Sequence, residues 1–481
     1  MSSPFASATE LARGLRARSL SARDLVETAI ERIDREHDRL NAVVARDFER
    51  ARIRAGEADA ALDRGECNQP LLGVPMTIKD SLETEGLVTT CGAPVLAQHV
   101  PARNADPVQR VIDAGAIVLG KTNVPLFAGD CQAFNEVYGT TNNPWDVTRT
   151  PGGSSGGAAA ALAAGLTPIE IGSDIGGSIR NPAHFCGVFG HKPTWGILPD
   201  RGHIPGPPGS LAQTDLAVVG PMARSAEDLA LLLDILAAPP STDVRGGWHL
   251  ELPAPRAQSP KGLRVAAWLD DPFSPVDDEY RTMLEASADA LERAGAIVDR
   301  SARPAVDFAT SYWTYGQLLG PVIAAGFPEE VIAGLEAAAR DIAPDDRSQH
   351  ALHVRGSLVS HREWLMHDEI RHQMSAAWAR FFRDFDVVLM PVIPTAAFPH
   401  DHHQDFHSRA LHVNGIERPY LDFLHWVSLA TVAGLPATVA PIGCTRAGLP
   451  VGVQIVGGRF EDRTTIQTSA WLGEFTPPPG F

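Results

Sequence analysis

The spacing of apolar residues predicts helices at the start of the chain. Apolar side chains recur on one helical face from Leu25 to Ile33. Just before them, Ser21 and Asp24 resemble a capping box in which Asp takes the place of Glu. A second helix is predicted at 47–61. We therefore expect a helical N-terminal cover over about residues 1–65, without chemistry of its own.

From residue 71 onward, short apolar runs alternate with amphipathic stretches. Strands are predicted near 72–80, 116–119, 168–172, 263–268, 296–298, 387–392, 438–441 and 451–456. Helices are predicted near 106–114, 158–164, 278–294 and 464–472, and through most of 305–382. This alternation is typical of a layered α/β fold. Length alone would allow about three domains, but no linker is long enough to separate them.

Composition and charge exclude several classes of protein. Hydrophobic residues make up 44% of the chain, which excludes general disorder. The net charge of −17 repels phosphate backbones, so no nucleic-acid partner is expected. No apolar run is long enough to cross a membrane, and the first twelve residues lack the pattern of a secretory signal. The five cysteines are widely spaced and form no CxxC pair, which indicates reduced thiols in a cytoplasmic protein.

Two glycine motifs match known signatures in spacing but lack the required context. The stretch 115–122 has the spacing of a phosphate-binding loop, yet the residues between its glycines are Ala-Ile-Val-Leu, which suit a buried strand. The stretch 152–156 fits GxSxG, but the segment before it is a loop rich in Pro and Asn, where a nucleophile elbow needs a strand. The sequence alone indicates a glycine turn at the start of a helix.

A second glycine turn, 172–178, offers better chemistry. A predicted strand leads into it, and two glycines precede Ser178. Glycines allow backbone N–H groups to converge, as an oxyanion hole requires. A serine nucleophile also needs a base, and a lysine can serve if burial keeps it neutral. Lys79 ends a predicted buried strand, but spacing alone does not bring it to Ser178.

Histidine is the more common base, and the chain has seventeen. Four of them, His400, His402, His403 and His407, fall within 399–407. Neighbouring histidines cannot easily all face one metal ion, so we expect a solvated polar loop there. Four others stand alone in the sequence and are expected to be structural: His184, His191, His203 and His425.

Taken together, these segments resemble the amidase signature family. The matching stretches are 151–165 and 172–183, with further matches at 73–80, 120–123, 190–196, 434–436 and 448–457. The resemblance implies an α/β amidase signature fold with a large mixed central sheet flanked by helices on both faces. It also implies one domain over residues 1–481, with its core at about 71–235 and 384–472. The segment at about 240–383 is where family members vary most.

The family's chemistry carries over to the matching positions. The resemblance implies that Ser178 is the nucleophile and Lys79 the neutral base. Ser154, after a cis peptide bond to Gly153, would relay the proton between them. The oxyanion hole would consist of the backbone N–H groups of Ile175, Gly176, Gly177 and Ser178. The residues expected to support this network are Ser155, Asp174 and Arg180.

This chemistry implies a hydrolase that cleaves an amide bond through an acyl-enzyme, without a metal or organic cofactor. A stretch that matches the family's pocket lining contributes Phe127, Gly129, Asp130, Cys131 and Gln132. The regions 312–319 and 398–426 are further candidates for the pocket. Four aromatic residues there suit a hydrophobic or aryl amide, or belong to the core: Phe406, Tyr420, Phe423 and Trp426. Esters, anilides and carbamates are not distinguished from amides.

Two other functions stay open. One is the glutaminase component of a tRNA-dependent amidotransferase, although the region 312–320 does not resemble that component's characteristic middle segment. The other is a non-catalytic binding protein on the same fold. We favour a stand-alone cytoplasmic amidase that acts on a small-molecule amide, with a homodimer as one option for its assembly.

Overall fold

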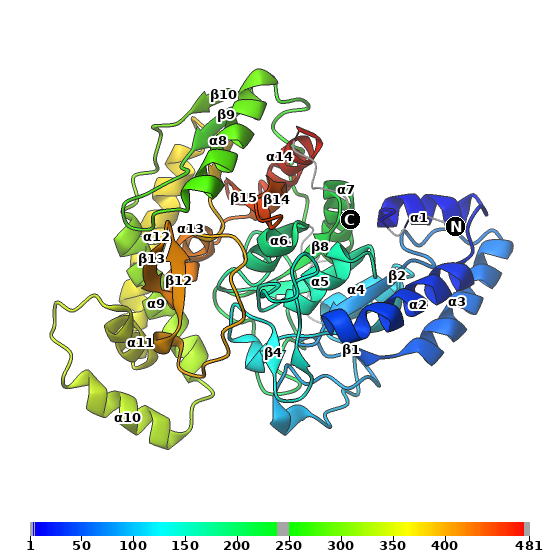
Figure 1. The fold of residues 1–481 in the computed structure, drawn as a ribbon, viewed down its shortest axis with the longest axis horizontal. Coiled ribbons are helices and arrows are strands. Elements are labelled where there is room, and N and C mark those ends of the chain that lie inside the picture. Colours follow the sequence, from blue (N-terminus) through cyan, green and yellow to red (C-terminus); the bar gives the residue numbers. More distant parts are fainter. Residues whose placement is uncertain (1–2, 4, 238–249, 476–481) are drawn as a thin grey trace.

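A large mixed sheet forms the centre of the protein (Figure 1). The computed structural model describes residue 3 and residues 5–237 and 250–475. Within these residues, eleven strands join in the order β1-β3-β2-β6-β8-β7-β14-β15-β11-β9-β10. Their bounds are β1 Val43–Arg46, β2 Pro75–Lys79, β3 Ile117–Thr122, β6 Ile169–Asp174, β7 Phe189–Lys192, β8 Val218–Ala223, β9 Arg264–Ala267, β10 Ile297–Asp299, β11 Val387–Met390, β14 Ala437–Cys444 and β15 Pro450–Gly457. The sheet contains both parallel and antiparallel pairs, as the family resemblance implies.

Every residue of the central strands β2, β6, β8 and β15 is buried. Helices therefore cover the sheet on both faces. The helices of the described residues are α1 Ala8–Arg16, α2 Ala22–Leu40, α3 Phe48–Asp63, α4 Asp106–Asp113, α5 Gly156–Ala163, α6 Arg180–Cys186, α7 Ala226–Leu236, α8 Asp278–Arg293, α9 Phe308–Ala324, α10 Glu329–Ala339, α11 Gln349–Ser357, α12 His361–Phe381, α13 His425–Val432 and α14 Asp462–Phe475. The predicted α/β architecture is confirmed.

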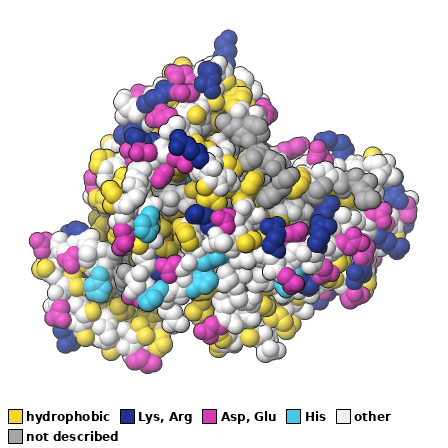
Figure 2. All heavy atoms as spheres, viewed as in Figure 1, with side chains coloured by type: hydrophobic (Ala, Val, Ile, Leu, Met, Phe, Trp, Pro, Cys, Tyr) yellow, Lys and Arg dark blue, Asp and Glu magenta, His cyan; other side chains and the backbone are white. Residues whose placement is uncertain are grey.

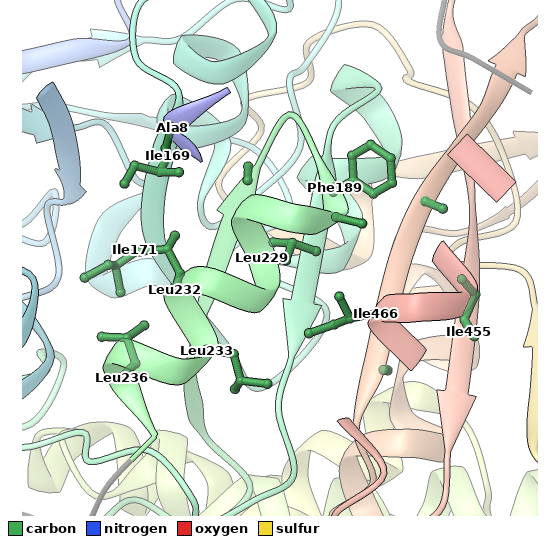
Figure 3. Packing of buried hydrophobic residues seen from close by; sticks show 14 of the residues in the cluster. Ala8, Ile169, Ile171, Phe189, Leu229, Leu232, Leu233, Leu236, Ile455 and Ile466 are labelled. Carbon is green, nitrogen blue, oxygen red and sulfur yellow. The ribbon is translucent and has the colours of Figure 1, made fainter. Parts of the chain in front are cut away.

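Leucine, isoleucine, valine and alanine side chains between helix and sheet make the main core. Figure 3 shows α7 lying over the sheet, with Leu232 and Leu236 near Ile171 of β6, and with Ile466 of α14 on its other side. All four side chains are at most 3% exposed. Burial of a side chain of this size contributes about 1.5–3 kcal/mol. Strand β6, which leads into the turn of Ser178, is therefore fixed in place by its packing against the core.

The order and direction of three strands position the candidate site. Strand β2 runs parallel to β6, with Thr77 opposite Glu170 and Ile78 opposite Ile171. The carboxyl ends of parallel strands meet at one edge of a sheet. The end of β2 at Lys79 is thereby brought next to the end of β6. This is the link that spacing along the sequence does not provide.

The N-terminal cover is helical as predicted, with one addition. Helices α1 to α3 lie together at one end of the molecule (Figure 1), and the hydroxyl of Ser21 accepts the N–H of Asp24 at 3.1 Å as an N-cap. Between α2 and α3, however, the chain forms β1, which pairs antiparallel with β3. Strand β1 has four residues, too few to show an alternating pattern, and its partner β3 lies far away in the sequence. The pattern therefore does not predict this strand.

The segment at 240–383 contributes to the main sheet. Of its described residues, β9 and β10 extend the sheet beyond β11 in parallel pairing. The helices that follow form a group at the end opposite the N-terminal cover (Figure 1). Within this group α9 and α11 cross closely. A Cβ atom on Gly320 would meet the carbonyl carbon of Gly356 at 2.1 Å. Small residues on both helices are what allow this crossing.

Candidate active site

Lys79 ends β2 in a fully buried position. Its Nζ atom lies 2.7 Å from Ser154 Oγ and 2.9 Å from Ser173 Oγ, and 3.4 Å from the carbonyl oxygen of Ser173. Burial lowers the pKa of Lys79 to about 7, even though Asp174 and Glu170 favour the charged form. An amine of this kind is neutral in a large fraction of molecules at neutral pH. It can accept a proton from the hydroxyl next to it.

Ser154 reaches Lys79 from the loop that precedes α5. The peptide bond between Gly153 and Ser154 is cis, as the family resemblance implies. Gly153 passes so close to another loop that a Cβ atom there would meet the backbone oxygen of Asp130 at 2.5 Å. Only glycine fits at this crossing, which fixes the loop before Ser154 against residues 130–132.

Asp174 builds the turn that carries Ser178. Its carboxylate accepts the backbone N–H of Gly177 at 3.0 Å and that of Ile179 at 3.1 Å. It also receives the Arg180 guanidinium at 2.7 Å, with both side chains fully buried. Burial alone would raise the pKa of this carboxyl group, but the charge of Arg180 lowers it to about 2. Asp174 and Arg180 therefore support the turn as an ion pair.

The backbone N–H groups of the turn are not equivalent. Gly177 donates its N–H to Asp174. Among the described residues, the N–H groups of Ile175, Gly176 and Ser178 have no hydrogen-bond acceptor. Unpaired N–H groups that converge on one point can stabilise a negatively charged oxygen. The turn thus presents three open donors, and the fourth predicted donor is already engaged.

Ser178 follows these donors and is 8% exposed. Its carbonyl oxygen accepts the N–H of Ser155 at 3.1 Å, which ties the turn to the loop of Ser154. Within the described residues, its hydroxyl group makes no hydrogen bond, either to Ser154 or to another residue. Catalytic hydrogen bonds are often open before substrate binds. The structure brings the two serine segments together and leaves the Ser178 hydroxyl free.

The predicted pocket-lining stretch divides into two parts. Asp130 is buried, where it pairs with Arg409 at 2.6 Å and accepts the Tyr420 hydroxyl at 2.6 Å. Gln132 exchanges two hydrogen bonds with the backbone of Asp401. These side chains hold the tract after residue 398 against the site. Phe127 and Gly129, by contrast, lie on an exposed turn.

Cys131 is the member of this stretch that contacts the turn. Its sulfur accepts the amide of Asn181 at 3.5 Å, and the same amide reaches the carbonyl oxygen of Gly176 at 3.3 Å. Burial raises the pKa of the Cys131 thiol far above its ordinary value, so the thiol stays neutral. It packs as a small apolar group beside the turn.

Helix α9 covers the other side of the turn. The Tyr315 hydroxyl donates to the carbonyl oxygen of Ile175 at 3.0 Å. A Cβ atom on Gly176 would meet Leu424 at 2.8 Å and the Tyr315 hydroxyl at 3.1 Å. Both residues belong to an apolar cluster with Tyr312. The wall beside the open N–H groups is therefore aromatic and aliphatic.

Of the four aromatic candidates, three are core residues. Tyr420, Phe423 and Trp426 are at most 7% exposed and pack within hydrophobic clusters, while Phe406 stacks on Tyr420. Tyr420 has a second role because its hydroxyl holds Asp130. The sequence pattern left a pocket role and a core role open, and packing decides for the core.

Sequence reasoning did not assign a role to two residues that contact the site. Ser173 lies within the recognised turn motif and contacts Lys79. His203, expected to be an isolated structural residue, lies 2.8 Å from Ser173 Oγ through its Nε2 atom. The motif gave a signal for Ser173, but only the fold brings His203 to it.

Two of the histidines after Pro399 lie on an exposed loop, as predicted, whereas His400 is partly buried. His402 and His403 are exposed, and His402 stacks on Phe134. Figure 2 shows histidine side chains scattered over this face, between acidic and basic groups. In the part of the chain that the structure describes, no group of three His, Cys, Asp or Glu side chains could hold a metal ion. Nor does any helix there have the length and apolarity to cross a membrane.

Comparison with known families and proteins is consistent across nearly the whole chain. The family model described as Amidase matches residues 24–466. One curated relative is the Glutamyl-tRNA(Gln) amidotransferase A subunit of Agathobacter rectalis. It is 30% identical over 479 residues, covering 96% of this chain and 92% of that protein. Further curated relatives at 30–32% identity carry the same name.

Solved structures of two kinds are similar to this one. The 6-aminohexanoate cyclic dimer hydrolase has a TM-score of 0.78 and 27% identity, covering 99% of this chain and 98% of its own. The Glutamyl-tRNA(Gln) amidotransferase A subunit of Thermotoga maritima has a TM-score of 0.74 and 25% identity, covering 95% and 92%. The first is named as a hydrolase and the second as one component of a larger enzyme.

Proposed function

This chain belongs to the amidase signature family and is a hydrolase of carbon–nitrogen amide bonds, and we propose that Ser178, Ser154 and Lys79 perform the cleavage. The observation that carries the proposal is the contact of 2.7 Å between a fully buried Lys79 and Ser154. A lysine in this environment is a base, and a hydroxyl beside it can pass on a proton.

In the proposed cycle, Ser178 Oγ attacks the amide carbonyl carbon. Its proton passes to Ser154, whose own proton passes to Lys79. The negative oxygen is held by the N–H groups of Ile175, Gly176 and Ser178. The proton returns along the same path to the departing amine, which leaves an ester on Ser178. Water then attacks the ester by the reverse route and releases the acid.

We propose a small hydrophobic or aryl amide as the substrate. The wall of Tyr312, Tyr315 and Leu424 supports this choice because it offers apolar surface beside the oxyanion donors. Two carboxylates near the turn are already paired with arginines, Asp174 with Arg180 and Asp130 with Arg409. An uncharged acyl group fits such a wall without burying an unpaired charge.

A second candidate is glutamine hydrolysis within an amidotransferase, and the curated relatives favour it over the stand-alone reading. Their name describes one component of an enzyme for Glu-tRNA(Gln). That function would require a partner protein, and it would place the enzyme near a nucleic acid, despite the chain's net charge of −17. Both candidates share the same amide cleavage and differ in the amide and in the partners.

A substrate panel separates the two candidates. The purified chain is offered L-glutamine, aliphatic amides, acyl anilides, esters and carbamates, with Ser178→Ala as the blank. Release of an aryl or alkyl amine without a partner supports the stand-alone amidase. Release of ammonia from glutamine, together with co-purification of a partner protein, supports the amidotransferase reading.

Labelling by a fluorophosphonate tests whether the site is catalytic at all. The probe is expected to label the wild-type chain and not Ser178→Ala. Lys79→Ala is expected to lower amide turnover by several orders of magnitude, since it removes the base. Full activity of either variant, or no labelling of a folded wild-type chain, would contradict the assignment and favour a non-catalytic binding protein.

A further inference from the structure

A row of four polar side chains runs from Ser154 through the buried Lys79 to the partly exposed His203. His203 Nε2 lies 2.8 Å from Ser173 Oγ, and Ser173 Oγ lies 2.9 Å from Lys79 Nζ. Lys79 Nζ in turn lies 2.7 Å from Ser154 Oγ. Each contact is within hydrogen-bond distance. The row therefore joins His203 to the proton relay through one hydroxyl group.

The segment that carries His203 is fixed against the chain just after Lys79. The N–H of Ile204 donates to the Ser81 carbonyl at 2.8 Å, and the N–H of Glu83 donates to the Gly202 carbonyl at 2.9 Å. His203 itself forms a β-bridge with Leu82. The imidazole is thus held in place by the same stretch that holds the lysine.

The direction of the hydrogen bonds decides whether Lys79 can act as a base. A neutral amine has two N–H groups and one lone pair. The lone pair must face Ser154, so both N–H groups need other acceptors. Ser173 offers its hydroxyl oxygen at 2.9 Å and its carbonyl oxygen at 3.4 Å. The hydroxyl oxygen serves as an acceptor from Lys79 when its own proton points elsewhere.

His203 is neutral and can therefore accept a hydrogen bond from the Ser173 hydroxyl. Burial, and then the charge of Lys79, lowers the pKa of His203 to about 3, so the ring is neutral at neutral pH. A neutral imidazole with its proton on Nδ1 accepts at Nε2. If the proton were on Nε2 instead, Ser173 would be free to donate to the lone pair of Lys79, and Lys79 would then donate to Ser154.

We propose that His203 is a positioning residue that accepts a hydrogen bond from the Ser173 hydroxyl and thereby directs the lone pair of Lys79 toward Ser154. The proposal rests on the proposed amide hydrolysis. His203 contacts neither the proposed nucleophile nor the oxyanion donors. It acts only by setting which group donates and which accepts each hydrogen bond between Ser173, Lys79 and Ser154.

The test compares His203→Phe with His203→Gln. Phenylalanine keeps a ring of similar size but has no acceptor, whereas the glutamine Oε1 reaches about as far as Nε2. We expect His203→Phe to lower both kcat/KM for an amide and the rate of fluorophosphonate labelling by roughly 10- to 100-fold. His203→Gln is expected to recover most of the loss. The matched control is His99→Phe, because His99 pairs with Glu83 and lies outside the row.

The double variant His203→Phe/Ser173→Ala separates positioning from a general structural role. If His203 acts through Ser173, the double variant is no slower than Ser173→Ala alone, because the interaction is already lost. Losses that multiply, or a His203→Phe variant as fast as wild type, would overturn the proposal.

If His203→Phe does not fold, His203→Gln and His203→Asn decide, since asparagine is one carbon too short to reach Ser173. Equal rates for these two variants would also overturn the proposal. Failure of the proposed function itself looks different. In that case the wild-type chain cleaves no amide in the panel, or Ser178→Ala cleaves it equally well.

Discussion

The proton affinity of Lys79 is set by its place at the buried end of β2. With a pKa of about 7, the amine is protonated in acid and loses its function as a base there. We expect kcat/KM for an amide to fall about tenfold per pH unit below pH 7 and to level off above it. Rates measured from pH 5 to 9 give this profile. A rate that stays constant down to pH 5 would exclude Lys79 as the base, provided that the unfolding temperature shows the fold is intact.

The same burial makes Lys79 a cost to stability. The unfolded chain keeps this lysine protonated up to about pH 10.5, whereas the folded chain releases the proton above about pH 7. Between these values the unfolded state binds more protons, so stability rises with pH. We expect Lys79→Met to raise the free energy of unfolding by roughly 1–3 kcal/mol at pH 7 and to abolish turnover.

Urea unfolding at pH 6, 8 and 10 measures this effect. The advantage of methionine over lysine is expected to be largest at pH 6 and to shrink toward pH 10. A methionine variant that is less stable than wild type at all three values would mean that the contacts to Ser154 and Ser173 outweigh the burial of the amine.

At the level of single residues, the sequence predicted the candidate residues of the site but not all of their contacts. The types and order of Lys79, Ser154 and Ser178 are visible as motifs. The bond from Ser173 to His203 is not, because it depends on a β-bridge between segments that only the folded chain brings together. The engagement of the Gly177 N–H by Asp174 likewise depends on the shape of the turn.

Among the elements, the short helix α6 fixes the turn of Ser178. The Arg180 side chain joins Asp174 to the carbonyl oxygen of Val427 in α13 at 2.8 Å and to Gln454 in β15 at 2.6 Å. Removal of one partner from a buried ion pair leaves an unpaired charge and costs about 3–5 kcal/mol. We expect this loss of stability for Asp174→Ala, together with loss of turnover.

The double variant Asp174→Ala/Arg180→Met is the control for this prediction. It removes both charges, so chemical denaturation is expected to show part of the stability recovered. Turnover is not expected to return, because Gly177 and Ile179 still lack their acceptor. A double variant less stable than Asp174→Ala would show that the hydrogen bonds of Arg180 matter more than its charge.

The elements that the sequence pattern predicted are the long amphipathic helices and the apolar strands. The unpredicted ones include helix α7 as well as strands that are short or contain residues unusual in strands. Strand β8 contains Gly220 and Pro221, and β7 spans only four residues. Both form through pairing with distant neighbours, β6 and β14. Local propensity is weak there, and tertiary pairing decides the structure.

At the scale of the whole molecule, the strands β9 and β10 connect the segment at 240–383 to the same sheet as the site. We therefore propose that the chain is a single domain and expect a single unfolding transition by calorimetry. Two separate transitions, one assigned by limited proteolysis to residues 250–383, would contradict this. Addition of a slow amide substrate is expected to raise the midpoint temperature of this single transition.

The hydrogen bond from Tyr315 to Ile175 has a consequence for how such an enzyme diversifies. The groups proposed for bond cleavage all lie between residues 79 and 203, whereas the helix that supplies this tyrosine comes from a later stretch of the chain. A gene library restricted to codons 308–358 that keeps Tyr315 is therefore expected to exchange one acyl preference for another while leaving the reaction unchanged. Selection on new amides would act on residues 308–358, while the proposed proton path through Ser178, Ser154 and Lys79 would stay the same.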